Sequence, residues 1–214
     1  MKNVQGKVVR RLYLNQFVMA IFGFMVVGAT AITNNLTLVI LASILAIGLY
    51  LFLVYDVMWN AGAKDVAKRL RAEDAQVDKV KTPLITLLFA GAFNIAGAIA
   101  YAVFWVVIYA QELTEGWIVL ASDGVRLTIG LTNTLYWGID ALLFPHPFTG
   151  MPYEEMIVLR ELYGPPTIIE LTPPYFYFLF PIPMVIAGML GYYVGSSEMK
   201  LSDILRKLGI GSDE

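Results

Sequence analysis

The sequence predicts an all-α integral membrane protein with four transmembrane helices and an outer helical cap, and three observations lead to this prediction. Hydrophobic residues make up 58% of the 214 residues and charged residues only 15%, against roughly 25% in an average soluble domain. The mean hydropathy is +0.67. The apolar residues gather in stretches of about 20, the length of a helix that crosses the hydrocarbon core. This composition, with a net charge of −2, excludes a disordered chain, an ordinary soluble enzyme and a nucleic-acid-binding protein.

Four stretches meet the length and composition of a membrane span, namely residues 12–32, 36–58, 84–110 and 175–194. The first follows a cluster of cations and could be a cleaved signal peptide, but its apolar run is long for one. We therefore expect it to be retained as a helix. The fourth contains Pro181 and Pro183, and because proline removes a backbone donor we expect a kink near Pro181.

The distribution of cations predicts a cell-membrane protein with both termini in the cytoplasm. Of the 15 Lys and Arg residues, four precede the first span, six lie in residues 59–82 and three in the tail 196–214. Cations gather on the cytoplasmic side, so these three regions should share one side. The expected segments are 1–58 (two spans), 59–82 (a charged helical linker), 83–110 (third span), 111–174 (outer cap), 175–195 (fourth span) and 196–214 (an amphipathic tail).

Residues 117–143 are the ambiguous part of the chain, because they are apolar and long enough to cross. A fifth crossing would export the tail with its three cations, so the four-span interpretation is favoured. A polar stripe runs along one face of the expected helix. Its members are Asp123, Arg126, Asn133 and Asp140, together with Gly130 and Trp137. The stripe either lines a water-filled cavity or faces water and headgroups, with Asp123 and Arg126 as a weak pair. The second interpretation is favoured.

Residues 144–174 are rich in proline and glycine, and we expect a short helix over 153–163 and an exposed or structural role for His146. The linker 59–82 should continue the second span as a helix. It would lie on anionic headgroups, with docking of a cytosolic partner as the alternative.

Small residues recur four apart in two spans, which favours close helix packing. In the third span, which we expect to be central, they are Ala92, Ala96 and Ala100, with Ala90, Ala98, Ala102, Gly91 and Gly97 alongside, and in the last span they are Gly188, Gly191 and Gly195. Asn94 is the one polar amide of the third span. We expect it to form a hydrogen bond with a neighbouring helix, and contact with a substrate is the alternative.

The sequence contains no motif that carries chemistry. Walker, G-x-S-x-G and H-E-x-x-H patterns are missing, there is no cysteine, and His146 is the one histidine, so we expect no cofactor, no metal and no catalytic residue. The favoured function is a non-enzymatic membrane subunit, whose partners besides the lipid bilayer are another protein or a second copy of the chain. A small transporter or permeation unit with a polar outer cavity is the alternative. An enzyme acting on lipid at the membrane interface is the weakest hypothesis.

Overall fold

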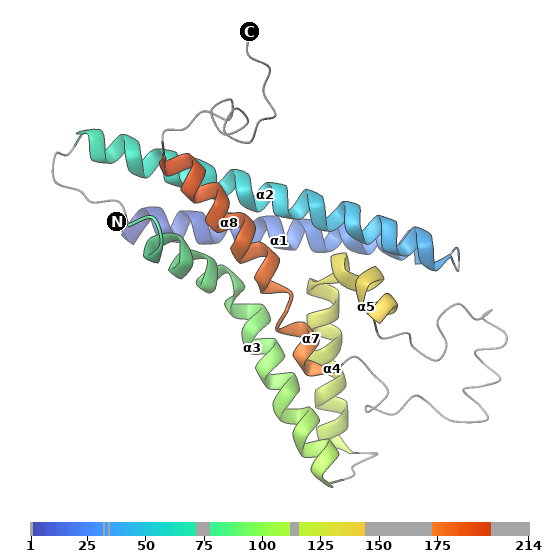
Figure 1. Ribbon diagram of the computed structural model, residues 1–214. Helices are drawn as coiled ribbons and strands as arrows, with labels where there is room; N and C mark the ends of the chain where they lie inside the picture. The colour runs from blue at the N-terminus through green and yellow to red at the C-terminus, as the bar shows by residue number, and fades with distance from the viewer. Residues whose placement is uncertain are drawn as a thin grey trace. The chain divides into compact units, whose positions relative to one another are not determined.

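The computed structural model describes residues 2–31, 33, 35–71, 78–111, 116–143 and 173–197, and within these ranges every regular element is a helix (Figure 1). Four helices are long and apolar enough to cross a membrane: Gly6–Thr30, Leu36–Ala67, Lys81–Gln111 and Pro174–Ser196. Each overlaps one of the four predicted spans. Their composition indicates a multi-pass membrane protein. The predicted helix 153–163, His146 and the tail lie outside the described residues, and the orientation of the termini stays a prediction.

The first two helices, α1 (Lys2–Ala31) and α2 (Leu36–Arg71), form a hairpin. The turn between them begins where the N–H of Thr33 donates to the carbonyl of Thr30 at 3.1 Å. It ends where Asn35 Oδ1 accepts the N–H of Leu38 at 3.3 Å, which satisfies a donor at the start of α2. Helix α2 continues past the predicted span to Arg71, as expected for the linker.

The third span is α3 (Lys81–Gln111). The side chain of Asp78 accepts hydrogen bonds from backbone N–H groups at the start of this helix. The Asp78 carboxylate accepts the N–H of Lys81 at 2.7 Å and that of Val80 at 3.0 Å. These two hydrogen bonds hold the pKa of the exposed Asp78 carboxyl below its ordinary value, because they stabilise its charged form.

The last span is interrupted. It consists of α7 (Pro174–Tyr177) and α8 (Pro181–Ser196) with a turn over residues 178–180. In that turn the N–H of Phe178 donates to Tyr175 and the N–H of Leu179 to Phe176. A kink near Pro181 was predicted, and the structure has a break there instead. Pro181 lacks the N–H that would continue α7, but it fits the first position of a new helix.

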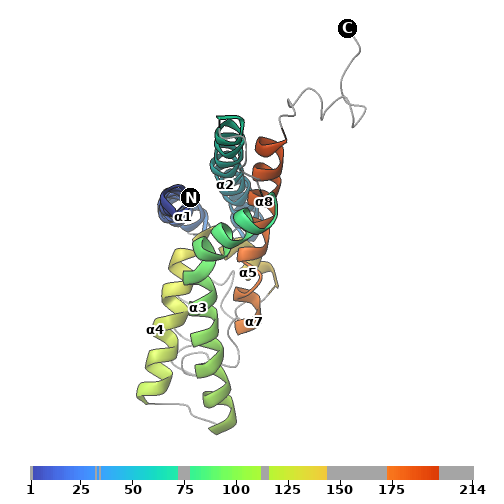
Figure 2. The same cartoon turned by 90° about the vertical axis from the view of Figure 1, so that its left-hand side faces the viewer.

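Residues 117–143 form three pieces rather than one helix. Helix α4 (Trp117–Thr132) ends at Asn133, a 3₁₀ turn η1 covers Thr134–Tyr136, and α5 is Trp137–Leu143. With 16 residues, α4 is about 24 Å long, which is shorter than the roughly 30 Å of a hydrocarbon core. Helix α4 lies beside α3 (Figures 1 and 2), where a Cβ on Gly97 would come within 2.9 Å of Ile129.

The chain divides into two compact units, one of residues 1–12, 51–90 and 184–214 and the other of residues 13–50 and 91–183. In the first unit α8 packs on α2 through a glycine face. Gly188, Gly191 and Gly195 are all buried. Cβ atoms at Gly191 and Gly195 would overlap the carbonyl oxygens of Tyr55 and Trp59 in α2, whereas Gly188 lies against Leu87 of α3. This is the close packing predicted for the last span.

The second unit holds the connecting residues between α4 and α5. Its α3 portion buries Ala98, one of the small residues noted in the third span, whereas Ala92 and Ala96 lie exposed. A small cluster of buried side chains, Val27, Val39 and Ala42, packs against Trp137.

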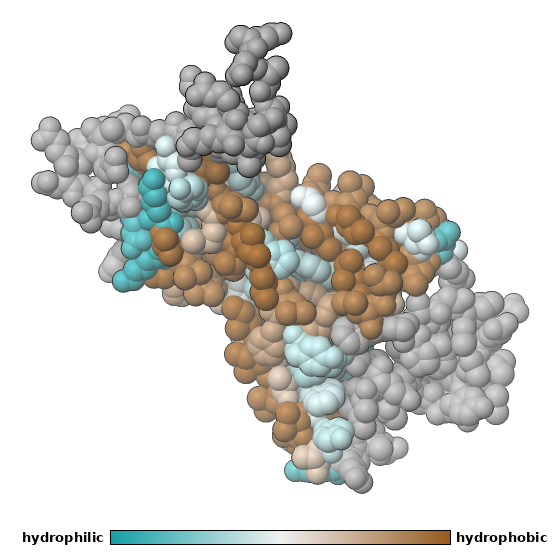
Figure 3. Space-filling view, viewed as in Figure 1, coloured by the Kyte–Doolittle hydropathy of each residue, from teal (hydrophilic) through white to brown (hydrophobic). Residues whose placement is uncertain are grey.

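Large hydrophobic side chains also cover the described surface, and brown dominates α2 and α3 in Figure 3. Leu45, Phe52 and Phe89 are each about two-thirds exposed, at 66%, 65% and 64%. Such extensive apolar exposure is unfavourable in water and is typical of a surface that faces lipid.

Candidate functional site

The connecting segment, residues 133–138, is held by hydrogen bonds to the surrounding helices of its unit. Thr134 Oγ1 donates to the carbonyl oxygen of Ala20 in α1 at 2.7 Å. The N–H of Gly138 donates to Ser43 Oγ in α2 at 2.8 Å. Both bonds are buried, and each satisfies a polar group that would otherwise be stranded in an apolar environment.

Two further bonds tie the segment to α3 and to the break in the last span. Asn133 Nδ2 donates to Asn94 Oδ1 at 3.2 Å and to the carbonyl of Ile129 at 2.9 Å. Tyr136 donates its hydroxyl proton to the carbonyl oxygen of Phe180 at 3.3 Å, and the two rings stack with centroids 4.4 Å apart. The predicted cross-helix bond of Asn94 is therefore present, with Asn133 as its donor.

Local hydrogen bonds support the end of α4 at Asn133. Asparagine competes with the helix by bonding nearby backbone groups, and here its side chain bonds back to Ile129. Trp137 Nε1 donates to the carbonyl oxygen of Gly130 at 3.1 Å, which satisfies one acceptor in the last turn of α4. Glycine at position 138 then allows the backbones to approach, because a Cβ there would lie 2.6 Å from the carbonyl oxygen of Val39.

A cavity of about 160 Å³ lies beside the connecting segment and touches both helix breaks. We call it the solute cavity. Its polar and aromatic lining comes from α4, from the connecting segment with α5, and from the turn after α7. The lining residues are Arg126, Leu127, Gly130, Leu131, Asn133, Tyr136, Trp137, Asp140, Tyr177 and Phe180.

One cation and one anion line the solute cavity, namely Arg126 and Asp140. Arg126 Nε lies 3.7 Å from Asp123 Oδ1, and the two side chains are 32% and 47% exposed. This pair of neighbours in the same helix is weak, of order 0–1 kcal/mol. Arg126 Nε is buried without a hydrogen-bond partner, so the ion pair leaves a donor unsatisfied at the cavity wall.

The polar stripe expected from the sequence is thus largely assembled at one place. Arg126, Asn133 and Asp140 line the solute cavity and Asp123 contacts Arg126, although the helix that was expected to align them ends at Asn133. The weak Asp123–Arg126 pair was also expected. A binding role for these residues stays a prediction.

Sequence reasoning missed Ser43, Thr134 and Tyr136, which fix the geometry of the connecting segment. A signal existed for Ser43, the one serine in the stretch 36–58, because a lone hydroxyl in an apolar helix needs a partner. No such signal exists for Thr134 and Tyr136, because the acceptors of their hydroxyl groups are backbone carbonyls 114 and 44 residues away in the sequence.

Within the described ranges, no group of three or more His, Cys, Asp and Glu residues could hold a metal ion. Comparison with protein family models, with curated proteins and with solved structures finds no match for this chain. Its function must therefore be argued from its own geometry.

Proposed function

We propose that the chain is a non-enzymatic, multi-pass membrane protein that binds a small polar solute in the solute cavity, as a small transporter or permeation unit. The observation that carries this proposal is that two interrupted helices meet at one polar cavity. Helix α4 ends at Asn133, the last span breaks over residues 178–180, and the bond from Tyr136 to Phe180 joins the two breaks.

Interrupted helices are informative in an apolar chain. Non-helical backbone at membrane depth is tolerated only where protein covers it or where it lines an aqueous cavity. Transporters place their substrates at such interruptions, where backbone groups and half-helix ends are available. The presence of both Arg126 and Asp140 in the cavity lining supports the same conclusion, because ionisable groups among apolar helices mark binding sites and pathways.

The size and charge of the cavity favour a small zwitterion. A volume of about 160 Å³ corresponds to roughly five water molecules at about 30 Å³ each, and drug-sized sites are larger, at about 300–1,000 Å³. The Arg126 guanidinium is suited to a carboxylate, and the Asp140 carboxylate is suited to an ammonium group. Glycine and alanine have this charge pattern and this size.

The experiment is uptake of radiolabelled glycine and alanine into proteoliposomes that contain the full chain. Uptake above that of empty liposomes is expected. It should fall at least about tenfold in Arg126→Gln and in Asp140→Asn, because a hydrogen bond to a charged group contributes about 1.5–3 kcal/mol. Arg10→Gln is the matched control, since Arg10 is exposed on α1 and does not line the cavity. Uptake no greater than in empty liposomes, or equal in wild type and both cavity variants, would refute the proposal.

A membrane subunit that assembles with itself or with another protein is the second candidate. It is favoured by the exposed position of Ala92 and Ala96 on α3, because small residues four apart typically face another helix. The chain has no cysteine, so Ala96→Cys gives a cross-linking probe without background. A disulfide-linked dimer in native membranes is expected for Ala96→Cys and not for Tyr109→Cys, because Tyr109 is exposed on a different side of the same helix. Equal cross-linking of the two variants would remove this candidate.

A further inference from the structure

A second cavity, of about 310 Å³, lies between α1 and α2 in the first unit, and its polar lining is cationic. We call it the basic cavity. Lys7 and Arg11 come from α1, Lys64 and Asn60 from α2, and the apolar remainder of the wall is Val8, Val57 and Ala61. None of these lining residues is acidic. Three cations around one hollow create a positive local potential, which favours the entry of an anion.

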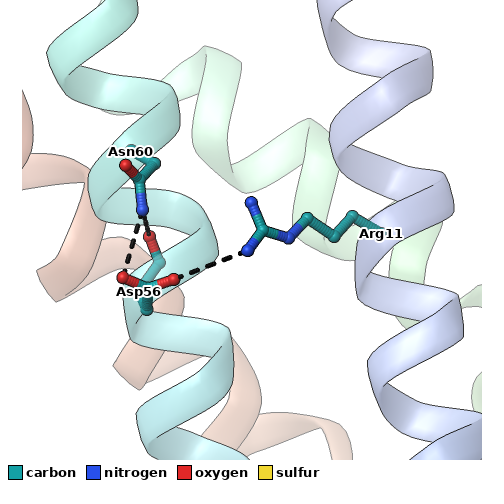
Figure 4. A network of polar contacts seen from close by, with 3 residues as sticks. All are labelled: Arg11, Asp56 and Asn60. Carbon is teal, nitrogen blue, oxygen red and sulfur yellow. Dashed lines mark hydrogen bonds and ion pairs between the residues drawn. The ribbon is translucent and has the colours of Figure 1, made fainter.

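Asp56 is an acidic residue that contacts two residues of the cavity lining, Arg11 and Asn60 (Figure 4). Asp56 Oδ2 lies 3.8 Å from an Arg11 Nη atom. Asn60 Nδ2 donates to Asp56 Oδ1 at 3.1 Å and to the Asp56 carbonyl oxygen at 2.8 Å. At 3.8 Å, with the two side chains 56% and 43% exposed, this contact is a weak ion pair that leaves the five guanidinium donors available to an anion. The three cations outnumber the one carboxylate.

The depth of the basic cavity follows from helix length. Counted along each helix, Arg11 is 20 residues from Ala31 at the end of α1, and Asp56 is 20 residues from Leu36 at the start of α2. At 1.5 Å per residue these stretches are about 30 Å long, which matches the roughly 30 Å of the hydrocarbon core. The basic cavity therefore lies at the level of the lipid headgroups when the hairpin spans the bilayer.

We propose that the basic cavity binds the phosphate of an anionic lipid headgroup. Arg and Lys are the side chains that bind phosphate oxygens most often, and basic pockets between transmembrane helices are known sites for such headgroups. The apolar wall of Val8, Val57 and Ala61 suits the glycerol and first acyl carbons, which free phosphate does not have. This site is independent of the solute cavity and of the proposed function.

The experiment is native mass spectrometry of the full chain in a neutral detergent, titrated with phosphatidylglycerol or phosphatidylcholine. Preferential binding of phosphatidylglycerol is expected. Lys7→Gln and Lys64→Gln should each weaken it about fivefold, because a basic residue near an anionic surface contributes about 1 kcal/mol. Both side chains are exposed, so the helices should fold in either variant. Arg10→Gln removes the same charge from a residue that does not line the cavity, and it should bind as the wild type does.

Three results would overturn the assignment. Equal binding of the two lipids would show that the headgroup charge is not recognised. Equal weakening in Arg10→Gln and in Lys64→Gln would show that only overall charge matters. Full displacement of phosphatidylglycerol by millimolar inorganic phosphate would show that the site takes a free anion and not a lipid. Retention of phosphatidylglycerol in phosphate buffer, with loss in both cavity variants, supports the proposal.

Discussion

The hydrogen bond between Asn94 and Asn133 can be tested energetically with a double-mutant cycle. The two residues are 5% and 4% exposed, and the amide nitrogen of Asn133 lies 3.2 Å from Asn94 Oδ1. Asn94→Ala removes this acceptor. The Asn133 amide keeps the carbonyl of Ile129 at 2.9 Å and Thr132 Oγ1 at 3.2 Å as acceptors. We therefore expect the free energy of unfolding to fall by only about 1 kcal/mol.

Asn133→Ala should be more damaging, because it removes all of these side-chain bonds at the end of α4. With about 1 kcal/mol for each hydrogen bond, we expect a loss of about 2–3 kcal/mol. In the double variant the bond between the two side chains is lost once and not twice. The loss should therefore be smaller than the sum of the two single losses by about 1 kcal/mol, between the average of about 0.6 kcal/mol and the maximum of about 1.7 kcal/mol measured between membrane helices.

The assay is reversible unfolding in mixed micelles of a mild detergent and dodecyl sulfate, followed by far-ultraviolet circular dichroism. Thr128→Val is a control, because Thr128 is exposed and its hydroxyl bonds only to a carbonyl of its own helix. The two single losses should exceed the loss in this control. Strict additivity of Asn94→Ala and Asn133→Ala would refute the reasoning, since it would mean that the two amides do not interact.

Three more predictions follow from particular contacts. Gly191→Ala should lower stability by about 2 kcal/mol, because its Cβ would overlap a carbonyl of α2. Gly48→Ala, with open space around position 48, should instead raise stability by about 0.5–1 kcal/mol. Equal effects of the two variants in the same unfolding assay would count against the glycine face. Ser43→Ala should lower stability by about 2 kcal/mol, because the buried N–H of Gly138 loses its acceptor. An unchanged unfolding midpoint in Ser43→Ala would contradict this prediction. The lowered pKa of Asp78 predicts a stabilising contribution that is complete above the ordinary value of 3.8 and is lost as the pH falls through the lowered pKa. The difference in thermal midpoint between wild type and Asp78→Ala should therefore be present at about pH 6 and shrink below about pH 3; a constant difference would refute the assigned cause.

The spans could be predicted from the sequence because lipid imposes a simple rule of length and apolarity on each helix. The glycine face of the last span could also be predicted, since Gly188, Gly191 and Gly195 recur at helical spacing. In α3, small residues recur on more than one side of the helix, and the structure buries Ala98 while Ala92 and Ala96 lie exposed. Spacing shows that a helix can be approached closely, but it does not show from which side.

The candidate site was only partly predictable, because some of its residues are grouped by helical spacing and others are positioned by contacts with residues that are distant in the sequence. Helical spacing was enough to group Arg126, Asn133 and Asp140 on one face. The break at Asn133 could not be seen, since the polar stripe continues through it without a proline or a change of period. It depends on contacts with distant helices, such as the bond from Gly138 to Ser43, which are 95 residues apart in the sequence.

The attachment of the connecting segment bears on how the polypeptide matures after translation. Its partners Ala20, Ser43 and Asn94 are all synthesised before it, but Phe180 emerges from the ribosome 44 residues after Tyr136. The connecting segment can form its hydrogen bonds to the first three helices during synthesis. The bond from the Tyr136 hydroxyl can form only after Phe180 has been synthesised. A nascent chain halted before Phe180 would therefore carry a pocket that lacks one of its walls.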